Sequence, residues 1–152
     1  MKRDIIFWDL DSTLACGDAR EHLIAAEGWD AFHSRCKEDT LHEDMFRLLE
    51  LITTLARSPM CVGLTGRNEK WRAITMEWLQ ENNVLLDELL MRPDGDFRSS
   101  VDVKIDLADS FTEGHIAERT LMLIDDRADI CDAFNQLGVT TLLVKNRTRS
   151  KE

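Results

Sequence analysis

Short apolar runs alternate along the chain with longer segments in which apolar residues recur every three or four positions. The short runs cover residues 4–8, 60–64, 120–124 and 139–144, and a weaker run covers 89–91. Runs of this length between polar and turn-forming residues are typical of buried β-strands. The pattern therefore predicts five strands.

The segments between these runs have the spacing of amphipathic helices. Their apolar stripes are Met45, Leu48, Leu49, Ile52 and Leu55 within about 43–57; Trp71, Ile74 and Trp78; Val101, Ile105 and Ala108, with Ser99 as a candidate N-cap; and Ile130, Phe134 and Leu137 before Gly138. Alternation of strand and helix predicts an α/β domain with a doubly wound, Rossmann-like parallel sheet that carries helices on both faces.

The stretch between the first two predicted strands is longer than one crossover needs. A helix at about 43–57 already suffices, so residues from about 17 to 39 are surplus. We predict that they form a small helical cap insertion above the carboxyl edge of the sheet, within a single domain of residues 1–152. Trp29 and Phe32 lie in it. We expect these two rings to pack the insertion onto the domain rather than to stack on a base.

Length and composition narrow the class of protein. The chain has 152 residues, of which 43% are hydrophobic and 32% charged, which indicates one globular domain and excludes a disordered or low-complexity chain. The apolar runs are too short to span a membrane, and the first residues have no signal-peptide pattern. The four cysteines form no CxxC motif. We expect reduced thiols, a cytoplasmic location and no obligatory protein partner.

Charge limits the kinds of ligand. The net charge is −10, and because the last eight residues hold four bases and one acid, residues 1–144 carry −13. A body of this charge repels long nucleic acids. The charge therefore favours a small or end-bound substrate, and we expect the basic tail at 145–151 to be a solvated end.

Polar residues that can carry chemistry follow three of the predicted strands. They are Asp9 and Asp11, then Thr65, Gly66 and Arg67, then Asp125, Asp126 and Arg127. The carboxyl ends of parallel strands meet at one edge of a sheet, so these groups should converge. Clustered carboxylates repel one another and call for a divalent cation, and oxygen ligands without paired His or Cys favour Mg2+. We expect the four histidines on polar helix faces and Trp71 and Trp78 in the core.

These residues resemble the motifs of a known superfamily. The string FWDLDSTLA, which contains Asp9, Asp11 and Thr13, is similar to the first motif of the haloacid dehalogenase superfamily. The second, third and fourth motifs resemble Thr65-Gly66-Arg67, Lys104 and Ile124-Asp125-Asp126. Segment 91–104, the run IDDR at 124–127 and Arg20 further resemble the 3′-phosphatase domain of bacteriophage polynucleotide kinase. No P-loop of a kinase half occurs in the chain.

Two positions depart from the family pattern. Ser12 follows Asp11 where glycine is frequent, and Ser100 stands four residues before Lys104 where related segments commonly carry an acid.

The resemblance implies a mechanism. Asp9 would attack phosphorus and form an aspartyl phosphate, while Asp11 would protonate the leaving alcohol and then activate water. Thr65 and Lys104 would assist the phosphate in the transition state. Mg2+ would be held by Asp9, the main-chain carbonyl of Asp11, and Asp126, with Asp125 close by. The substrate-binding residues implied are Thr13, Arg20, Gly66, Arg67 and Arg98.

Three functions stay open at this point. The first is a magnesium-dependent phosphomonoesterase that removes terminal (3′) phosphate from nucleotides or polynucleotide ends. The second is a phosphatase for free 5′-mononucleotides or other small phosphoesters, which the charge of −13 favours. The third is a catalytically weak metal- and phosphate-binding module, against which Asp9, Asp11, Lys104 and Asp126 argue.

Overall fold

A five-stranded parallel sheet forms the centre of the molecule in the computed structural model, which describes residues 5–145. The sheet order is β5-β4-β1-β6-β7, with β1 in the middle. The strands are β1 (Ile5–Trp8), β4 (Met60–Asn68), β5 (Glu88–Arg92), β6 (Thr120–Asp125) and β7 (Thr141–Leu143). Phe7 of β1 pairs with Val62 on one side and Leu123 on the other. The predicted fold class is confirmed.

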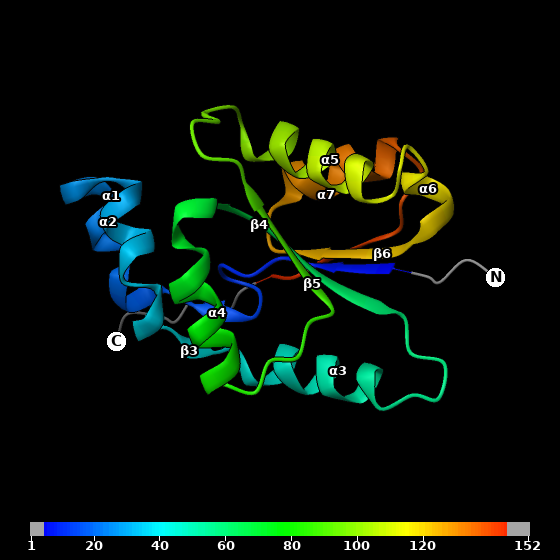
Figure 1. Ribbon diagram of the computed structural model, residues 1–152, viewed down its shortest axis with the longest axis horizontal. Coiled ribbons are helices and arrows are strands. Elements are labelled where there is room, and N and C mark those ends of the chain that lie inside the picture. The colour runs from blue at the N-terminus through cyan, green and yellow to red at the C-terminus, as the bar shows by residue number, and fades with distance from the viewer. Residues whose placement is uncertain (1–4, 146–152) are drawn as a thin grey trace.

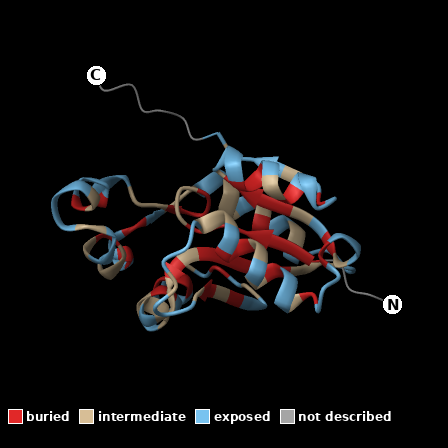
Figure 2. Cartoon of the chain, turned by 90° about the horizontal axis from the view of Figure 1, so that it is seen from above, coloured by how far each residue is buried: buried red, intermediate tan, exposed pale blue. Residues whose placement is uncertain are grey.

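Helices cover both faces of the sheet, as Figure 1 shows. One face carries α5 (Ser100–Phe111), α6 (Ile116–Arg119) and α7 (Ala128–Gln136), and the other carries α3 (Glu43–Thr53) and α4 (Arg72–Glu81). Successive strand residues point to opposite faces. Ile5 and Phe7 therefore join the core around Phe134, and Ile6 and Trp8 join the core around Trp78. The strands are accordingly buried along most of their length (Figure 2).

The helix boundaries follow local signals. The Oγ of Ser99 accepts a hydrogen bond from the N–H of Asp102 at 3.1 Å, so the predicted cap of α5 is confirmed. Gly138, which follows α7, has φ +87°, a conformation that favours glycine. Trp78 is a core residue of α4. Trp71 instead ends the 3₁₀ turn η3 (Glu69–Trp71) before α4 and is only partly buried, so its assignment to the helical core stripe was wrong.

Strand β4 is longer than the sequence predicts. It continues from Leu64 through Asn68, and its pairing with β5 becomes irregular between Thr65 and Asn68. Thr65, Gly66 and Arg67 therefore lie in an extended strand and not in a turn.

Residues 17–39 form the segment that we call the cap. It lies between the short antiparallel strands β2 (Ala15–Cys16) and β3 (Thr40–Leu41). It contains η1 (Asp18–Arg20), α1 (His22–Glu27), α2 (Trp29–Ser34) and η2 (Cys36–Glu38), and α1 and α2 project beyond the sheet in Figure 1. The indole N–H of Trp78 donates to the carbonyl of Asp39 at 2.9 Å, and Lys70 pairs with Asp30 at 2.7 Å. The cap is thus attached to the core at its base and at α2.

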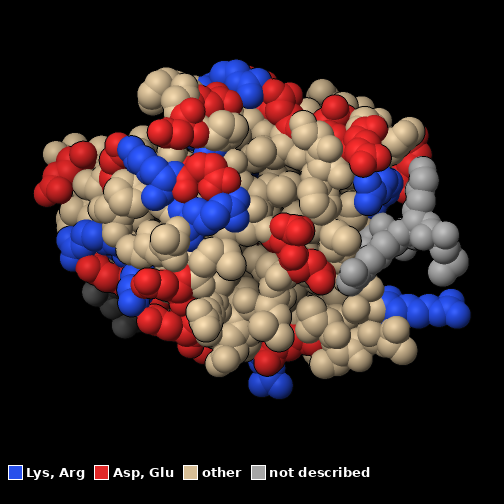
Figure 3. Space-filling view, in the orientation of Figure 1, with Lys and Arg blue, Asp and Glu red and all other residues tan. Residues whose placement is uncertain are grey.

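Charges of both signs are spread over the surface. In Figure 3 the described basic side chains alternate with acidic ones and do not form a continuous basic surface on this face. Within the described part of the chain, no helix is both long and apolar enough to cross a membrane. None of the four cysteines forms a disulfide, and Cys61 and Cys131 are buried as expected. The basic tail predicted to be a solvated end falls, from residue 146 onward, outside the described residues.

Candidate active site

Three carboxylates meet where β1 and β6 end. Asp9 follows β1, and its N–H donates to the carbonyl of Ile124 at 3.0 Å, which ties it to the neighbouring strand. Asp125 is the last residue of β6, and Asp126 follows it. Oxygen atoms of Asp9, Asp125 and Asp126 lie within 4.8 Å of one another. The predicted convergence of these strand ends is therefore observed.

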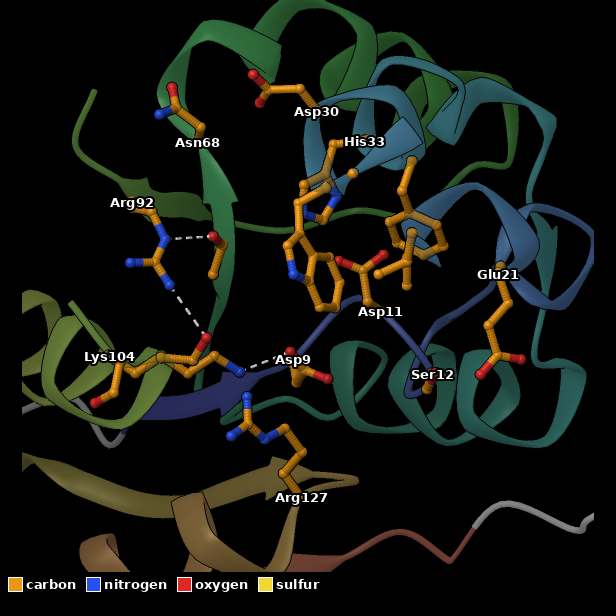
Figure 4. Close-up of a pocket in the computed structure, with 18 of the residues that line it drawn as sticks. Asp9, Asp11, Ser12, Glu21, Asp30, His33, Asn68, Arg92, Lys104 and Arg127 are labelled. Carbon is orange, nitrogen blue, oxygen red and sulfur yellow. Dashed lines mark hydrogen bonds and ion pairs between the residues drawn. The ribbon is translucent and has the colours of Figure 1, made fainter. Parts of the chain in front are cut away.

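Lys104 reaches this group from α5. Its Nζ donates to Asp9 Oδ1 at 2.7 Å and to Asp125 Oδ2 at 2.6 Å, and the contact with Asp9 is drawn in Figure 4. We call Asp9, Lys104, Asp125 and Asp126 the carboxylate cluster. Burial, together with the charges of Asp125 and Asp126, raises the pKa of Asp9 well above its usual 3.8 even though Lys104 opposes the shift. One lysine thus faces three acids, and the cluster has an excess of negative charge.

This cluster fits a divalent cation. Its ligands are all carboxylate oxygens, which suit Mg2+. Burial raises the pKa of Asp9 and the carboxylates of Asp125 and Asp126 raise it further, so a cation among the three carboxylates would stabilise the ionised form. The side chain of Asp11 is not part of this group of oxygens.

A second group of charges lies between Asp11 and the cap. Arg67 donates to Asp11 Oδ1 at 2.7 Å through Nη2 and to Oδ2 at 3.0 Å through Nε. Arg20 donates to the two oxygens of Asp39 at 2.5 and 2.6 Å, and Arg67 Nη2 lies 3.4 Å from Asp39. We call Asp11, Arg20, Asp39 and Arg67 the cap-base cluster. It holds two acids and two bases.

The pKa values in this second cluster differ from that of Asp9. Burial would raise the pKa of Asp11, but the charge and hydrogen bonds of Arg67 outweigh it and lower that pKa to about 2. Burial raises the pKa of Asp39, and its bonds to Arg20 oppose that shift. Asp11 is therefore ionised at neutral pH and is held by Arg67. In Figure 4 its carboxylate lies on the side of His33 and the cap.

Two predicted substrate ligands do not face open space. The side chains of Arg20 and Arg67 are fully buried. Arg20 also donates to the carbonyl of Phe32 and lies 4.0 Å from the centre of its ring, and Arg67 donates to Thr75 at 3.2 Å. The donors of both arginines are occupied by protein groups in this structure, where they hold Asp11 and the cap.

Two hydroxyl groups also act within the protein. Thr13 is fully buried, and its Oγ1 donates to Asp9 Oδ2 at 2.9 Å. Thr65 is buried as well, and its Oγ1 accepts from the N–H of Arg67 at 3.1 Å. Thr13 was predicted to contact substrate, but here it orients Asp9.

A cleft of about 870 Å³ opens above the carboxylate cluster. Asp9, Asp11, Lys104 and Asp126 line its floor, the cap forms one wall, and the loop between β5 and α5 forms another. Arg98 of that loop lines the cleft, as predicted for a substrate ligand, and pairs with Asp96 at 2.8 Å and Asp106 at 2.5 Å. Open space of this size suits a nucleotide-sized group.

Gly66 packs closely against Ser100. A Cβ added there would lie 3.0 Å from Ser100 Oγ. Arg92 donates to the carbonyl of Gly66 at 2.8 Å and to Ser100 Oγ at 3.1 Å, contacts that Figure 4 marks. Ser100, which stands where related segments carry an acid, thus helps to hold Arg92. Ser12 has φ 65°, which explains why glycine is frequent at that position.

The sequence analysis missed several residues of the cleft and its base. His33 lines the cleft, and burial, together with the positive charges of Arg67 and Arg20, lowers its pKa to about 4 although Asp11 opposes the shift. Asp39 is the buried partner of Arg20, and only its place at the end of the insertion could have pointed to it. Trp29 is 61% exposed and lines the cleft, so the prediction that it packs the cap onto the domain was wrong. Phe32 is buried, as expected.

Comparison with known proteins identifies a family and solved structures that are similar to this chain. Residues 3–148 match the family model of the polynucleotide kinase PNKP phosphatase domain. A chain of the Pnkp1/Rnl/Hen1 RNA repair complex superposes with a TM-score of 0.78 at 23% identity, covering 94% of this chain and 42% of that one. A chain in a second structure of the Pnkp1/Rnl/Hen1 complex superposes with a TM-score of 0.77 at 23% sequence identity, covering 94% of this chain and 45% of that one. This chain therefore spans less than half the length of those two.

Other solved structures share the fold at lower identity. The haloacid dehalogenase hydrolase YfnB from Bacillus subtilis, solved with bound magnesium, superposes with a TM-score of 0.67 at 12% identity and covers 100% of this chain and 91% of its own. A search among curated proteins gives no match.

Proposed function

The chain belongs to the family of polynucleotide kinase PNKP phosphatase domains and is a phosphatase of the haloacid dehalogenase superfamily, and on this premise we propose how it acts and on what. We propose that it is a magnesium-dependent phosphomonoesterase that works through an aspartyl phosphate and removes the terminal 3′-phosphate from nucleotides or polynucleotide ends. The observation that carries the proposal is the carboxylate cluster, in which Asp9 contacts Lys104 at 2.7 Å on the floor of an open cleft.

Asp9 is the proposed nucleophile. A carboxylate oxygen of Asp9 bonds to phosphorus as the bond from phosphorus to the leaving alcohol oxygen breaks, and Asp11 supplies the proton that this oxygen takes. Asp11 then removes a proton from water, whose oxygen bonds to phosphorus and releases inorganic phosphate and free Asp9. Lys104 offsets the negative charge of the phosphoryl group in both steps.

Mg2+ would be held by Asp9 and Asp126 with Asp125 close by. When bound, it neutralises the carboxylates so that an anionic phosphate can approach them. Thr13 keeps the Asp9 carboxylate in place through its 2.9 Å hydrogen bond.

Arg67 controls the protonation of Asp11. Its hydrogen bonds favour the ionised form, which is the form that activates water. To protonate the leaving group, Asp11 has to hold a proton, and this requires its bonds to Arg67 to weaken. Arg67 therefore sets the balance between the two steps.

The substrate class rests on the family and on the shape and charge of the cleft. The cleft is open, which suits a phosphate at the end of a larger molecule. Arg98 and Arg127 line it beside Lys104 and could face a flanking phosphate. The acids Asp18, Glu21, Glu27 and Asp30 line the cap wall and favour the second candidate, a phosphatase for small phosphoesters.

A substrate panel separates these candidates. The panel compares 3′-phosphorylated oligonucleotides, 3′-mononucleotides, 5′-mononucleotides and sugar phosphates, each with Mg2+ and with chelator, and uses Asp9→Asn as the blank. We expect kcat/KM to be highest for a 3′-phosphorylated end, with little gain beyond a few nucleotides, and activity to disappear in chelator. A preference for 5′-mononucleotides or sugar phosphates would replace the first candidate by the second.

A further inference from the structure

Two aromatic rings are exposed in the same cleft. Among the described residues, the large hydrophobic side chains that are exposed include only two aromatics, Trp29 at 61% and Phe97 at 95%. Both line the cleft above Asp9, one from the cap and one from the loop between β5 and α5. The other exposed large hydrophobic side chains are aliphatic and lie outside it. Exposed apolar surface that gathers at a cleft is typical of a ligand site.

Trp29 is held in a fixed position. It is the first residue of α2, and its ring stacks on His33 with a centroid distance of 5.7 Å and an angle of 25°. It also meets the ring of Phe32 edge to face at 5.7 Å. The next residue, Asp30, pairs with Lys70 of the core. The indole is thus supported from behind, while most of its surface faces solvent.

Phe97 is presented by its loop. Arg92 Nη1 donates to the carbonyls of Asp96 at 3.1 Å and Arg98 at 2.6 Å, the two residues that flank Phe97. The side chain of Arg98 is in turn held by Asp96 and Asp106. Because the loop is fixed on both sides of Phe97, the ring stays exposed to solvent. A ligand that covers the ring would gain binding free energy from its burial.

We infer that Trp29 and Phe97 form a subsite that stacks on the unpaired base of the 3′-terminal nucleotide while its phosphate lies at Asp9. The inference rests on the proposed function and adds to it the part of the substrate that the cleft recognises. The charges fit this orientation, because Lys104 and Arg127 lie at the phosphate end and Glu21 and Glu27 line the cap wall. An acidic wall repels a phosphate but accepts an uncharged base, and stacking on aromatic rings is available to every base.

The first test compares two substrates that differ only in the base. One is a 3′-phosphorylated trinucleotide, and the other carries a tetrahydrofuran ring in place of its last nucleoside. We expect Trp29→Ala to raise KM for the complete trinucleotide about ten-fold, with kcat nearly unchanged, and to leave the abasic substrate unaffected. Phe97→Ala should act in the same direction, and Trp29→Phe should keep most of the affinity. Leu85→Ala is the matched control, since Leu85 is 76% exposed but lies outside the cleft.

Binding without turnover gives a second readout. Trp8 and Trp78 are buried and Trp71 is partly buried, so Trp29 is the most exposed of the four indoles. Titration of Asp9→Asn with the same trinucleotide should quench tryptophan fluorescence, and the double variant with Trp29→Phe should lose this quenching. Absence of quenching, or equal effects of Trp29→Ala on both substrates, overturns the inference. If wild type hydrolyses neither trinucleotide, the proposed substrate is wrong, while the titration still decides the stacking.

Discussion

The carboxylate cluster and the cap-base cluster both contain an aspartate of the first motif, but their charges differ. Asp9 lies with Asp125 and Asp126 against a single lysine, Lys104. Asp11, two residues further on, lies in a group where two arginines face two aspartates. The pKa of Asp9 is raised well above 3.8, and that of Asp11 is lowered to about 2. Neighbouring positions in the sequence thus enter opposite electrostatic environments.

This difference gives the two clusters different tasks in the proposed mechanism. The excess of negative charge around Asp9 is costly unless a cation joins it, so the carboxylate cluster is suited to binding Mg2+. The cap-base cluster satisfies its own charges and ties Asp11 to the cap through Arg67, Asp39 and Arg20. We expect substitutions in the first cluster to affect mainly activity. In the second cluster, substitutions of Arg20 and Asp39 should affect mainly stability, whereas those of Asp11 and Arg67 should affect both.

Asp9→Asn should give the largest effect. The amide has nearly the shape of the carboxylate but is a poor nucleophile, so kcat should fall at least about a thousand-fold. The melting temperature in chelator should not fall below that of wild type, because the substitution removes a carboxylate that is repelled by its neighbours. Steady-state kinetics and thermal unfolding check both parts. Retention of a tenth of the wild-type rate would exclude Asp9 as the nucleophile.

Arg67→Met should destabilise the protein by about 3–5 kcal/mol, because it leaves the partly buried carboxylate of Asp11 and the buried carboxylate of Asp39 without their shared partner. Urea unfolding measures the loss. Lys104→Met is the matched variant in the other cluster, and there Mg2+ can replace the lost positive charge. We therefore expect saturating Mg2+ to restore stability to Lys104→Met and not to Arg67→Met. Equal restoration of both variants would contradict the distinction between the clusters.

Mg2+ should stabilise wild type by about 2.7 kcal/mol at a concentration one hundred times its Kd, because it binds only the folded arrangement of carboxylates. Asp126→Asn should weaken this stabilisation, since Asp126 is one of the three clustered acids. Asp39→Asn should lower stability but leave the shift caused by Mg2+ unchanged. Thermal unfolding with and without chelator measures these shifts, and their persistence in Asp126→Asn would remove that residue from the metal site.

The sequence predicted the first cluster far better than the second. Asp9, Asp125 and Asp126 lie at the carboxyl ends of parallel strands, and the sheet topology alone brings such strand ends together. Whether Arg20 and Arg67 face the cleft or the interior depends on side-chain conformation and on their pairing with Asp39. No periodicity in the sequence indicates that pairing. The same holds for Trp29 and Phe32, which are three residues apart on one helix and differ only in how that helix sits on the core.

The smallest expected effect is a pair of opposite pH dependences in metal-free protein. A carboxyl group with a raised pKa, such as Asp9, binds its proton more tightly in the folded state, so stability falls as the pH rises from its usual pKa of 3.8 toward the raised value. The pKa of Asp11 is shifted in the opposite direction, so its effect on stability has the opposite sign. Its stabilisation is fully present above 3.8 and is lost as the pH falls toward its folded pKa of about 2, which corresponds to about 2 kcal/mol.

Urea unfolding in chelator across this pH range, with wild type, Asp9→Asn and Asp11→Asn compared at each pH, separates the two contributions. Asp9→Asn should reduce the loss of unfolding free energy that wild type shows as the pH rises above about 4. Asp11→Asn should remove part of the gain in unfolding free energy between pH about 2 and about 4. Addition of Mg2+ should suppress the decline due to Asp9 and leave the rise due to Asp11 unchanged, because Arg67 and not the cation stabilises the Asp11 carboxylate. If both variants changed the same limb of the profile, the two aspartates would share one electrostatic environment, and the separation into two clusters would fail.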